Sequence, residues 1–402
     1  PKTGGEFREG IVGQPIFINP VVPVSQADRD LSRLVFSSAE DIAESVKISE
    51  DNRTYNLRIK EGILWQDGEK LTTDDIVFTV QTIQNPAANS TLLTSFQGVS
   101  VERVSELEIK FILQIPYAFF EQDNLKNLFI IPKHIFADTP VENLKLSAFG
   151  LEPIGSGPYK VSSYKKDEKG VITLMNLAEN ENYFGDKPYI SKITFKFYRN
   201  TAELLKGFNS GEIDGFGLST AESLGDIKLR HNVSYLPSLR YYAVFINQSS
   251  SNKNLMDLKT RRALAEVVDR KKMTEEIFAS HASLLYGPTT LTDIPDYTID
   301  TTLLKDIQLN VTVPEEPFLV KTAEALKSTW ESYGAKVNLR ILSLKNILED
   351  VSRTIDYELL LFGNTVSVEK DLFAFWHSSR RSYPEQNLSL YQNKNVDREL
   401  EA

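Results

Sequence analysis

Apolar and polar residues alternate along several stretches of the chain, and this period-two pattern predicts strands. A strand signal opens the chain over residues 6–19, and Tyr55, Leu57 and Ile59 alternate with polar neighbours in the next one. Alternating stretches joined by short polar turns predict two antiparallel hairpins. These pair residues 99–101 with 107–113, and 159–164 with 171–174.

Helical spacing appears between these strands. Thr72, followed by Thr73, Asp74 and Asp75, predicts a helix with a hydroxyl cap and an acidic first turn. A β-α-β unit is predicted with strand 193–197, helix 202–208 and a return at 213–214, and a further helix over 258–268 with Asp257 as its cap.

The clearest pattern lies near the C-terminus. Residues 307–313 alternate, residues 319–333 repeat apolar positions at spacings of three and four, and Gly334 ends that helix. Strands follow at 337–341 and 357–362, and Trp330 is assigned to the core. Because strands joined by a helix and short loops form right-handed crossovers, the chain is predicted to be a mixed α/β protein with at least two lobes.

Composition then limits the possible functions. A chain of 402 residues is long enough for two or three domains, and its apolar content of 41% is that of a globular protein. The net charge of −10, without a long basic run, argues against nucleic acid and anionic membrane surfaces as partners. There is no cysteine, which excludes disulfides and thiolate metal sites.

No pattern of catalytic or cofactor-binding residues stands out. The four histidines lie far apart in the sequence, and neither a Gly-x-Ser-x-Gly elbow nor a dinucleotide glycine pattern occurs. The glycines of Gly155-Ser156-Gly157 precede Pro158 and a strand, whereas a phosphate loop precedes a helix. They are therefore interpreted as a turn, and no cofactor or metal is predicted.

Eight stretches, taken in order along nearly the whole chain, resemble the family-5 extracellular solute-binding proteins, the peptide- and nickel-type receptors of ABC importers. The resemblance rests on residues 55–80, 130–136, 152–161, 181–198, 211–215, 258–270, 330–339 and 375–400. Within it, the Gly-Ser-Gly-Pro-Tyr turn looks like a structural signature of the family that need not touch a ligand.

The resemblance implies a two-lobed α/β fold of the periplasmic-binding-protein type II kind, with an additional α+β subdomain in the first lobe. Expected boundaries are 1–37 and 154–240 for the first lobe, 38–153 for the subdomain, 241–247 for the hinge crossing and 248–402 for the second lobe. Such a protein is not an enzyme. It is expected outside the cytoplasm, in the periplasm or lipid-anchored, as a monomer that captures a solute and delivers it to an ABC permease.

Other interpretations remain open at this point. The same fold binds sugars, opines or metal chelates in other members, and a sensor or scaffold without transport is a further alternative. A hydrolase using a cleft carboxylate would form products from peptides, whereas a receptor would retain them reversibly.

Parallel α/β sheets bind ligands at loops after the carboxyl ends of their strands. In the second lobe these loops are 314–317, 343–346 and 363–370, which are expected to face residues 17–19 of the first lobe, with Tyr241 and Asn247 near the hinge. The candidate ligand-binding residues are Phe17, Asn19, Tyr241, Asn247, Glu315, Ser343, Asn346, Gly363, Asn364, Thr365, Glu369 and Trp376.

Receptors of the dipeptide type hold the ligand's ammonium with an Asp in the third loop and its carboxylate with an Arg near the first. Here the third loop has acids only at Glu369 and Asp371, and the first loop has no Arg. Because an Arg fork is hard to replace, free dipeptides are expected to bind weakly and longer peptides are favoured.

Three expectations concern continuity. The chain begins at Pro1 rather than Met, which is compatible with removal of a targeting segment. Family members have extra segments near Ser37-Ser38 and near residues 297–302, so the sequence is expected to join segments there. A further strand is expected after the helix that starts near Asn395.

Overall fold

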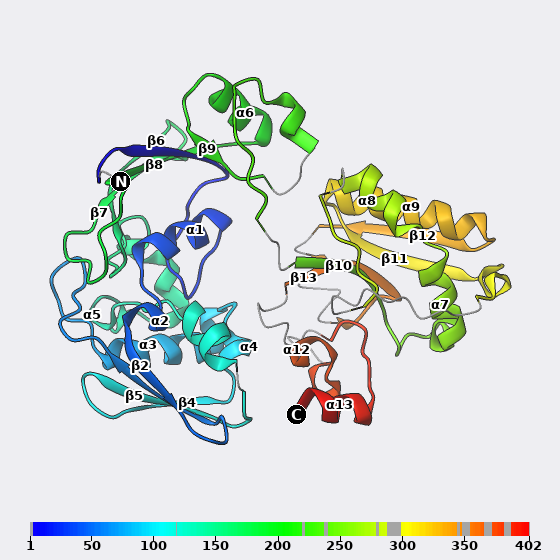
Figure 1. Cartoon of the computed structure of the whole chain (residues 1–402), viewed down its shortest axis with the longest axis horizontal. Coiled ribbons are helices and arrows are strands. Elements are labelled where there is room, and N and C mark those ends of the chain that lie inside the picture. The colour runs from blue at the N-terminus through cyan, green and yellow to red at the C-terminus, as the bar shows by residue number, and fades with distance from the viewer. Residues whose placement is uncertain are drawn as a thin grey trace. The chain divides into compact units, whose positions relative to one another are not determined.

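The computed structural model describes residues 3–117, 119–218, 222–236, 240–278, 281–287, 299–343, 346–347, 354–365, 372–381 and 387–401. The chain divides into two compact units, each built of strands and helices (Figure 1). Unit 1 comprises Pro1–Ser219 with Gly225–His231, and unit 2 comprises Thr220–Leu224 with Asn232–Ala402.

Unit 1 contains a mixed five-stranded sheet. Its order is β6 (Tyr159–Lys166), β7 (Ile172–Glu179), β8 (Lys192–Tyr198), β1 (Glu6–Val12) and β9 (Gly215–Phe216). The predicted hairpin is confirmed as β6–β7, and the β-α-β unit as β8, α6 (Thr201–Asn209) and β9, with β1 between the two strands. The opening strand ends at Val12, earlier than predicted, because the chain then turns toward α1 (Gln26–Val35).

A second sheet in unit 1 is wholly antiparallel. Its order is β2 (Ala43–Ile48), β3 (Thr54–Ile59), β5 (Glu108–Leu113) and β4 (Val99–Arg103). The predicted β4–β5 hairpin and the alternation of β3 are confirmed, since Tyr55, Leu57 and Ile59 are buried. Helix α3 (Thr73–Gln84) starts where predicted, with Thr72 and Asp75 in a reciprocal capping box. The short helices α2 (Ala39–Ile42), α4 (Leu93–Phe96) and α5 (Lys133–Phe136) complete this part.

The Gly-Ser-Gly turn packs against the last turn of α1. The Gly157 amide donates to the Val35 carbonyl at 2.8 Å, and the Ser37 hydroxyl donates to the Ser156 carbonyl at 3.0 Å. Ser38 next to it caps α2. On either side of the Ser37-Ser38 junction, the Ile130 amide donates to the Ser37 carbonyl at 3.0 Å and the Ala39 amide donates to the Leu128 carbonyl at 2.8 Å. Residues 297–298 lie outside the described residues. That the sequence joins segments at these two places stays a prediction.

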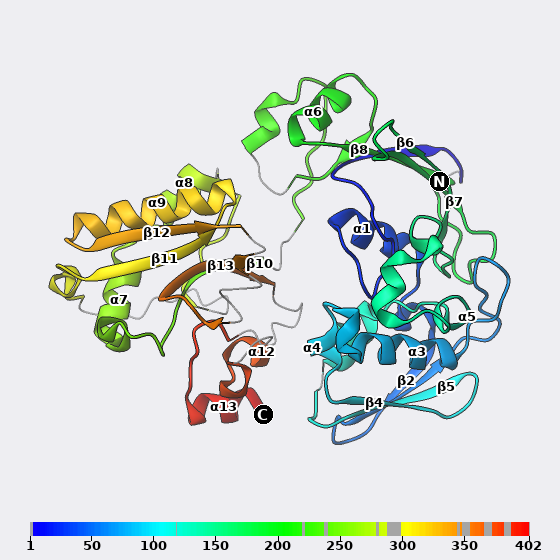
Figure 2. The ribbon, with the colours of Figure 1, turned by 180° about the vertical axis from the view of Figure 1, so that it is seen from behind.

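Unit 2 is built on a four-stranded sheet, which can be followed in Figure 2. Its order is β10 (Arg240–Ile246), β13 (Leu359–Thr365), β11 (Gln308–Pro314) and β12 (Lys336–Leu342). Strands β11, β12 and β13 are parallel, as the strand-helix-strand pattern predicted, and β10 is antiparallel to β13. Helix α9 (Pro317–Ser332) joins β11 to β12 and ends before Gly334, whose φ is +92°.

The two faces of this sheet differ. Helices α7 (Leu258–Glu266) and α9 form one core with Leu309, Val311 and Val313, and α8 (Arg270–Phe278) packs on α9. Trp330 lies in this core, 2% exposed, with its indole nitrogen donating to the Leu264 carbonyl at 2.9 Å, as predicted. On the opposite face of the sheet, the side chains of β10 and β13 are apolar, whereas those of β11 and β12 are polar.

Candidate functional site

The carboxyl ends of the three parallel strands lie along one edge of the unit 2 sheet. The Glu315 amide after β11 donates to the Leu342 carbonyl at the end of β12, at 2.9 Å, so the first two predicted loops are joined. In the second loop, the Ser343 hydroxyl accepts from the Asn346 amide at 3.2 Å. The Glu315 and Asn346 side chains are exposed, as a ligand-contacting position requires.

The third loop begins next to β10. Antiparallel pairing sets Tyr241 opposite Asn364 and Arg240 opposite Thr365, so Tyr241 does reach this edge. Gly363 is opposite Tyr242, and an added Cβ there would lie 2.5 Å from the Tyr242 ring. Glu369 falls outside the described residues.

Asn247 lies at the other end of β10, because that strand runs opposite to β13. Its side-chain amide donates to the Tyr357 carbonyl at 2.8 Å, and its oxygen accepts from the Ser249 amide at 2.8 Å. The structure therefore does not bring Asn247 to the edge that carries Tyr241, and it gives Asn247 a bonding role inside unit 2.

Phe17 and Asn19 lie deep within unit 1. The Phe17 ring is 2% exposed and packs on Gly150, where an added Cβ would lie 2.5 Å from it. Asn19 is fully buried, and its oxygen accepts from the Val21 amide at 2.9 Å, while its side-chain nitrogen has no partner among the described residues. Both residues therefore shape the loop before α1 from within.

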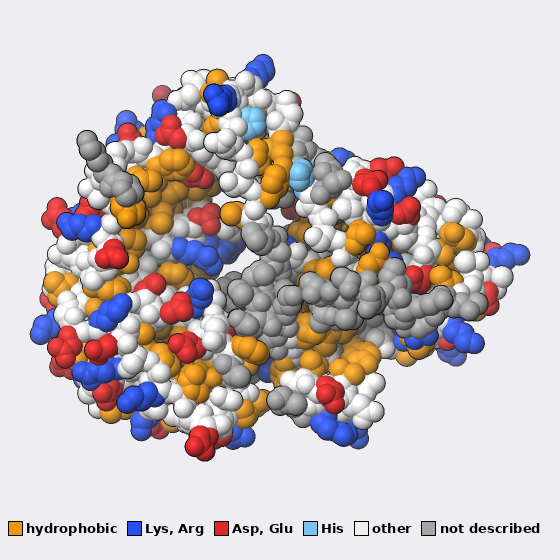
Figure 3. Space-filling model, viewed as in Figure 1, with side chains coloured by type: hydrophobic (Ala, Val, Ile, Leu, Met, Phe, Trp, Pro, Cys, Tyr) orange, Lys and Arg blue, Asp and Glu red, His pale blue; other side chains and the backbone are white. Residues whose placement is uncertain are grey.

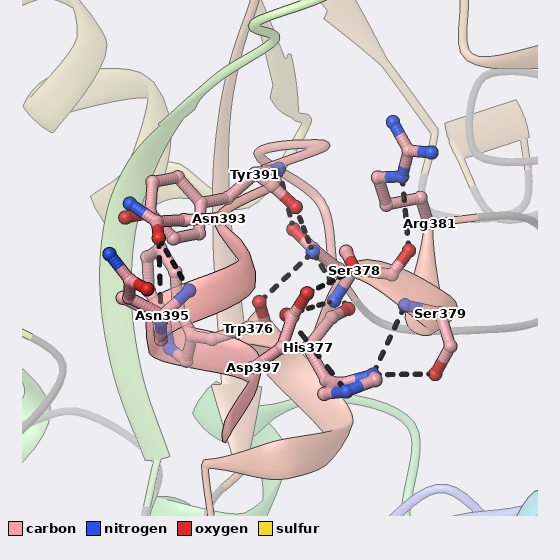
Figure 4. A network of polar contacts seen from close by, with 11 residues as sticks. Trp376, His377, Ser378, Ser379, Arg381, Tyr391, Asn393, Asn395 and Asp397 are labelled. Atoms are coloured by element: carbon pink, nitrogen blue, oxygen red, sulfur yellow. Dashed lines mark hydrogen bonds and ion pairs between the residues drawn. The ribbon is translucent and has the colours of Figure 1, made fainter. Parts of the chain in front are cut away.

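Trp376 ends the short helix α12 (Phe373–Trp376) and packs edge-on against Tyr391, with ring centroids 6.3 Å apart (Figure 4). The surrounding stretch is tied together by amide and carboxylate groups. Asn387 is 2% exposed and its side-chain nitrogen donates to the carbonyls of His377 and Tyr391. Within the sequence motif at residues 375–400, the described residues around Trp376 thus form a cluster held together by hydrogen bonds.

Asp397, on α13 (Lys394–Glu401), belongs to the same hydrogen-bonded cluster. Its carboxylate accepts from the Ser378 amide at 2.9 Å and the Ser378 hydroxyl at 2.6 Å (Figure 4). These bonds hold the pKa of the Asp397 carboxyl below its usual range.

His377 and Ser379 raise the question of a nucleophile and its base, since the Ser379 hydroxyl lies 2.7 Å from Nδ1 of His377. The Ser379 amide also donates to that nitrogen, at 3.1 Å, which is how a side chain caps a short helix. The Asp397 carboxylate lies 3.9 Å from Nε2 and is occupied by Ser378. The contacts of His377 with Ser379 are therefore interpreted as the cap of a short helix and not as a nucleophile with its base.

The described residues contain no group of three His, Asp or Glu side chains placed to hold a metal ion. None of the described helices combines the length and apolar character needed to cross a membrane. On the face seen in Figure 3, acidic and basic side chains are interspersed over the described surface of both units.

One ionisable group that the sequence interpretation did not select is Glu9 on β1. It is half-buried, and its carboxylate forms no hydrogen bond or ion pair with any described residue. Burial, reinforced by the nearby Asp30 carboxylate, raises the pKa of Glu9 from 4.5 to about 7. The folded protein therefore binds a proton at Glu9 more tightly than the unfolded chain does.

Replacing Glu9 with Gln is expected to stabilise the protein at alkaline pH. The full shift from 4.5 to about 7 corresponds to about 3 kcal/mol, which solvent screening of a half-exposed group reduces to about 1 kcal/mol. The wild-type penalty is absent below the unfolded pKa and grows as pH rises to 7. Urea unfolding should therefore show E9Q gaining about 1 kcal/mol near pH 8 and nothing near pH 4.

Glu6 on the same strand provides the control. The Thr194 hydroxyl and Lys192 lower the pKa of Glu6, so E6Q should lose stability near neutral pH. Equal gains for E9Q at both pH values would contradict the assignment of the effect to charge.

Sequence comparison decides the family. The family model described as bacterial extracellular solute-binding proteins, family 5 Middle, matches residues 39–308, which is more than half of the chain. The chain belongs to the family 5 bacterial extracellular solute-binding proteins. The resemblance noted in the sequence is therefore confirmed.

Relatives of this family 5 protein agree with that assignment. The oligopeptide-binding protein AppA of Bacillus subtilis is 26% identical over 305 residues, which cover 72% of this chain and 54% of AppA. The chain thus spans about half the length of the curated relatives it matches.

Solved structures confirm the fold. The ABC transporter substrate-binding protein CtaP of Listeria monocytogenes matches with a TM-score of 0.80 and 26% identity, covering 100% of this chain and 86% of CtaP. AppA in complex with a nonapeptide matches with a TM-score of 0.76 and 22% identity, covering 99% and 86%. The predicted two-lobed α/β fold is therefore correct, and the family comprises binding proteins rather than enzymes.

Proposed function

We propose that this protein is the extracytoplasmic receptor of an ABC importer and captures oligopeptides. The match to the family 5 model carries this proposal, and the naming of AppA as an oligopeptide-binding protein supports the ligand class. Ligand contacting both lobes would favour a closed state by hinge motion, and a membrane permease would receive it. One chain suffices for this mechanism, so the receptor is proposed to act as a monomer.

The loops at the carboxyl edge of the unit 2 sheet would supply the contacts on that side. Glu315, Ser343 and Asn346 lie on the first two loops, and Tyr241 is next to Asn364 at the third. Backbone donors and acceptors at such strand ends suit a peptide main chain, which binds largely independently of its side chains.

Peptide length should decide affinity. The first loop offers Glu315 and Glu316 and no Arg, so the carboxylate of a free dipeptide finds no guanidinium fork there. A longer peptide gains main-chain hydrogen bonds along its length. Calorimetry should find nonapeptides bound at about micromolar Kd or tighter, and dipeptides at least about 100-fold more weakly.

The experiment uses one sequence shortened stepwise from nine residues to two, with native mass spectrometry of the purified protein to identify any ligand already bound. Submicromolar dipeptide binding would refute the length argument. Absence of binding at every length, or peptide cleavage during the titration, would refute the receptor proposal.

A further inference from the structure

Three neighbouring strands of unit 2 bring one residue each to the same level near the carboxyl edge of the sheet. Antiparallel pairing sets Tyr242 of β10 opposite Gly363 of β13. On its other side β13 runs parallel to β11, with Val311 opposite Leu359. Continuing this register along both strands sets Glu315, the first residue after β11, level with Gly363. These three residues therefore form a row across the edge that carries the proposed peptide contacts.

The three residues of the row belong to one face of the sheet. Side chains along a strand alternate in direction, so residues two positions apart share a face. Each residue of the row lies two positions from one that packs in the core with α9, and these core residues are Val244, Leu361 and Val313. Tyr242 and Glu315 are therefore expected on the α9 side, and the glycine places no side chain between them.

The Tyr242 ring is held in position by its neighbours. An added Cβ on Gly363 would lie 2.5 Å from the ring, so the ring passes directly over the glycine. The ring packs edge-on against Phe318 of α9, with centroids 5.0 Å apart, and Phe318 packs in turn against Phe278 of α8 at 5.9 Å. Tyr242 still exposes 37% of its surface. Because a ring fixed in this way loses little conformational freedom on binding, its exposed part is prepared for contact with a ligand.

Glu315 brings an unbalanced negative charge to this row. Its side chain is exposed, and neither its carboxylate nor that of Glu316 forms an ion pair or hydrogen bond with any described residue. Arg240 lies at the same edge, opposite Thr365, but on the strand farther from Glu315. Carboxylates pair with cations, and the face of an aromatic ring also attracts them. The space between the Tyr242 ring and Glu315 therefore favours a positively charged group.

We infer that Tyr242 and Glu315 form a subsite for a basic side chain, that of Arg or Lys, of the captured peptide. The charged group would lie against the Tyr242 ring and pair with the Glu315 carboxylate. Two strand spacings separate the two Cα atoms by about 10 Å, which leaves room for one long side chain. This inference rests on the proposed receptor function and names its ligand class as oligopeptides that contain a basic residue.

The test uses nonapeptides of alanine and serine that carry either Arg or citrulline, a neutral isostere of Arg, at each position in turn. Calorimetry with the full chain should find the Arg peptide bound about tenfold more tightly at one position at least, from one cation–π contact and one exposed ion pair. Glu315→Gln and Tyr242→Leu should each lower this ratio to about threefold, and the double variant should lower it to about one. Each variant is referred to its own affinity for the citrulline peptide, so a general loss of affinity cancels in the ratio. An acid that served only the helix dipole of α9 would change stability and not the ratio.

Glu324→Gln and Tyr333→Leu are the matched controls. Glu324 is an exposed acid in the middle of α9, and Tyr333 is 42% exposed at the C-terminal end of that helix, away from the loops. Both variants should keep the ratio of the wild-type protein.

Three results would overturn the subsite. These are equal binding of the Arg and citrulline peptides by the wild-type protein, a ratio that persists in the double variant, and an equal fall of the ratio in E315Q and E324Q. Failure of the wild-type protein to bind any of these peptides would instead refute the receptor proposal, and the subsite with it.

Discussion

Gly155→Ala should destabilise unit 1 by about 3 kcal/mol, the upper part of the range for overpacked cores. An added Cβ would lie 1.9 Å from the Val35 carbonyl oxygen and 2.8 Å from a Val35 side-chain carbon. The oxygen belongs to the backbone at the end of α1, so no rotamer change relieves the contact. The turn is also anchored from the other side, because the backbone amide of Gln66 donates to the Gly155 carbonyl at 2.9 Å.

Gly217→Ala provides the comparison, because nothing lies within 4 Å of a Cβ built there and its φ is not positive. Urea unfolding followed by circular dichroism should show a large loss for G155A and almost none for G217A. Similar unfolding free energies for the two variants would show that the approach of Gly155 to Val35 is not a constraint.

The turn at Gly155-Ser156-Gly157 was predicted from the sequence, but its packing against α1 was not. Pro158 and the strand after it indicated a turn rather than a phosphate loop, which is a local inference. That both glycines are needed because α1 ends against them could not be predicted, since Val35 lies more than a hundred residues away in the chain. In contrast, β3 and α9 were predicted because their alternation and spacing are carried within a few turns of chain.

Helix α1 was missed although its signal is present. Ala27, Leu31, Leu34 and Val35 repeat at helical spacing, and Ser25 with Asp28 forms a capping box. The strand signal was instead extended through to Asn19 and no helix was assigned after it. A search for a cap followed by period-3.6 spacing would have found this element.

The candidate site depended on relations between distant strands. Tyr241 and Asn247 were both placed near the hinge crossing, and the seven-residue strand β10 separates them by about 20 Å. The contact between the Asn310 and Asn338 side chains depends on the register of β11 against β12, which aligns two residues 28 positions apart. Neither relation is contained in local sequence patterns.

Asp28→Ala should cost about 4 kcal/mol, because one buried carboxylate holds the loop before α1. It is fully buried and accepts four backbone amides, from Ile16 at 2.7 Å, Phe17 at 2.9 Å, Val24 at 3.0 Å and Ser25 at 2.8 Å. Each buried donor left unpaired costs about 1–3 kcal/mol, and water entry at the partly exposed ones reduces the sum. The capping box of α1 is lost as well.

Asp30→Ala, two residues along the same helix, should cost less than about 0.5 kcal/mol, because among the described residues that exposed carboxylate accepts only from the Gln26 side chain. Hydrogen exchange should locate the effect of D28A, with the amides of Phe17 and Ser25 losing protection before those of β3. If both variants unfold at the same urea concentration, the four amide bonds contribute little. If D28A loses stability without faster exchange at Phe17, Asp28 acts through the helix cap rather than by holding the loop that carries Phe17 and Asn19.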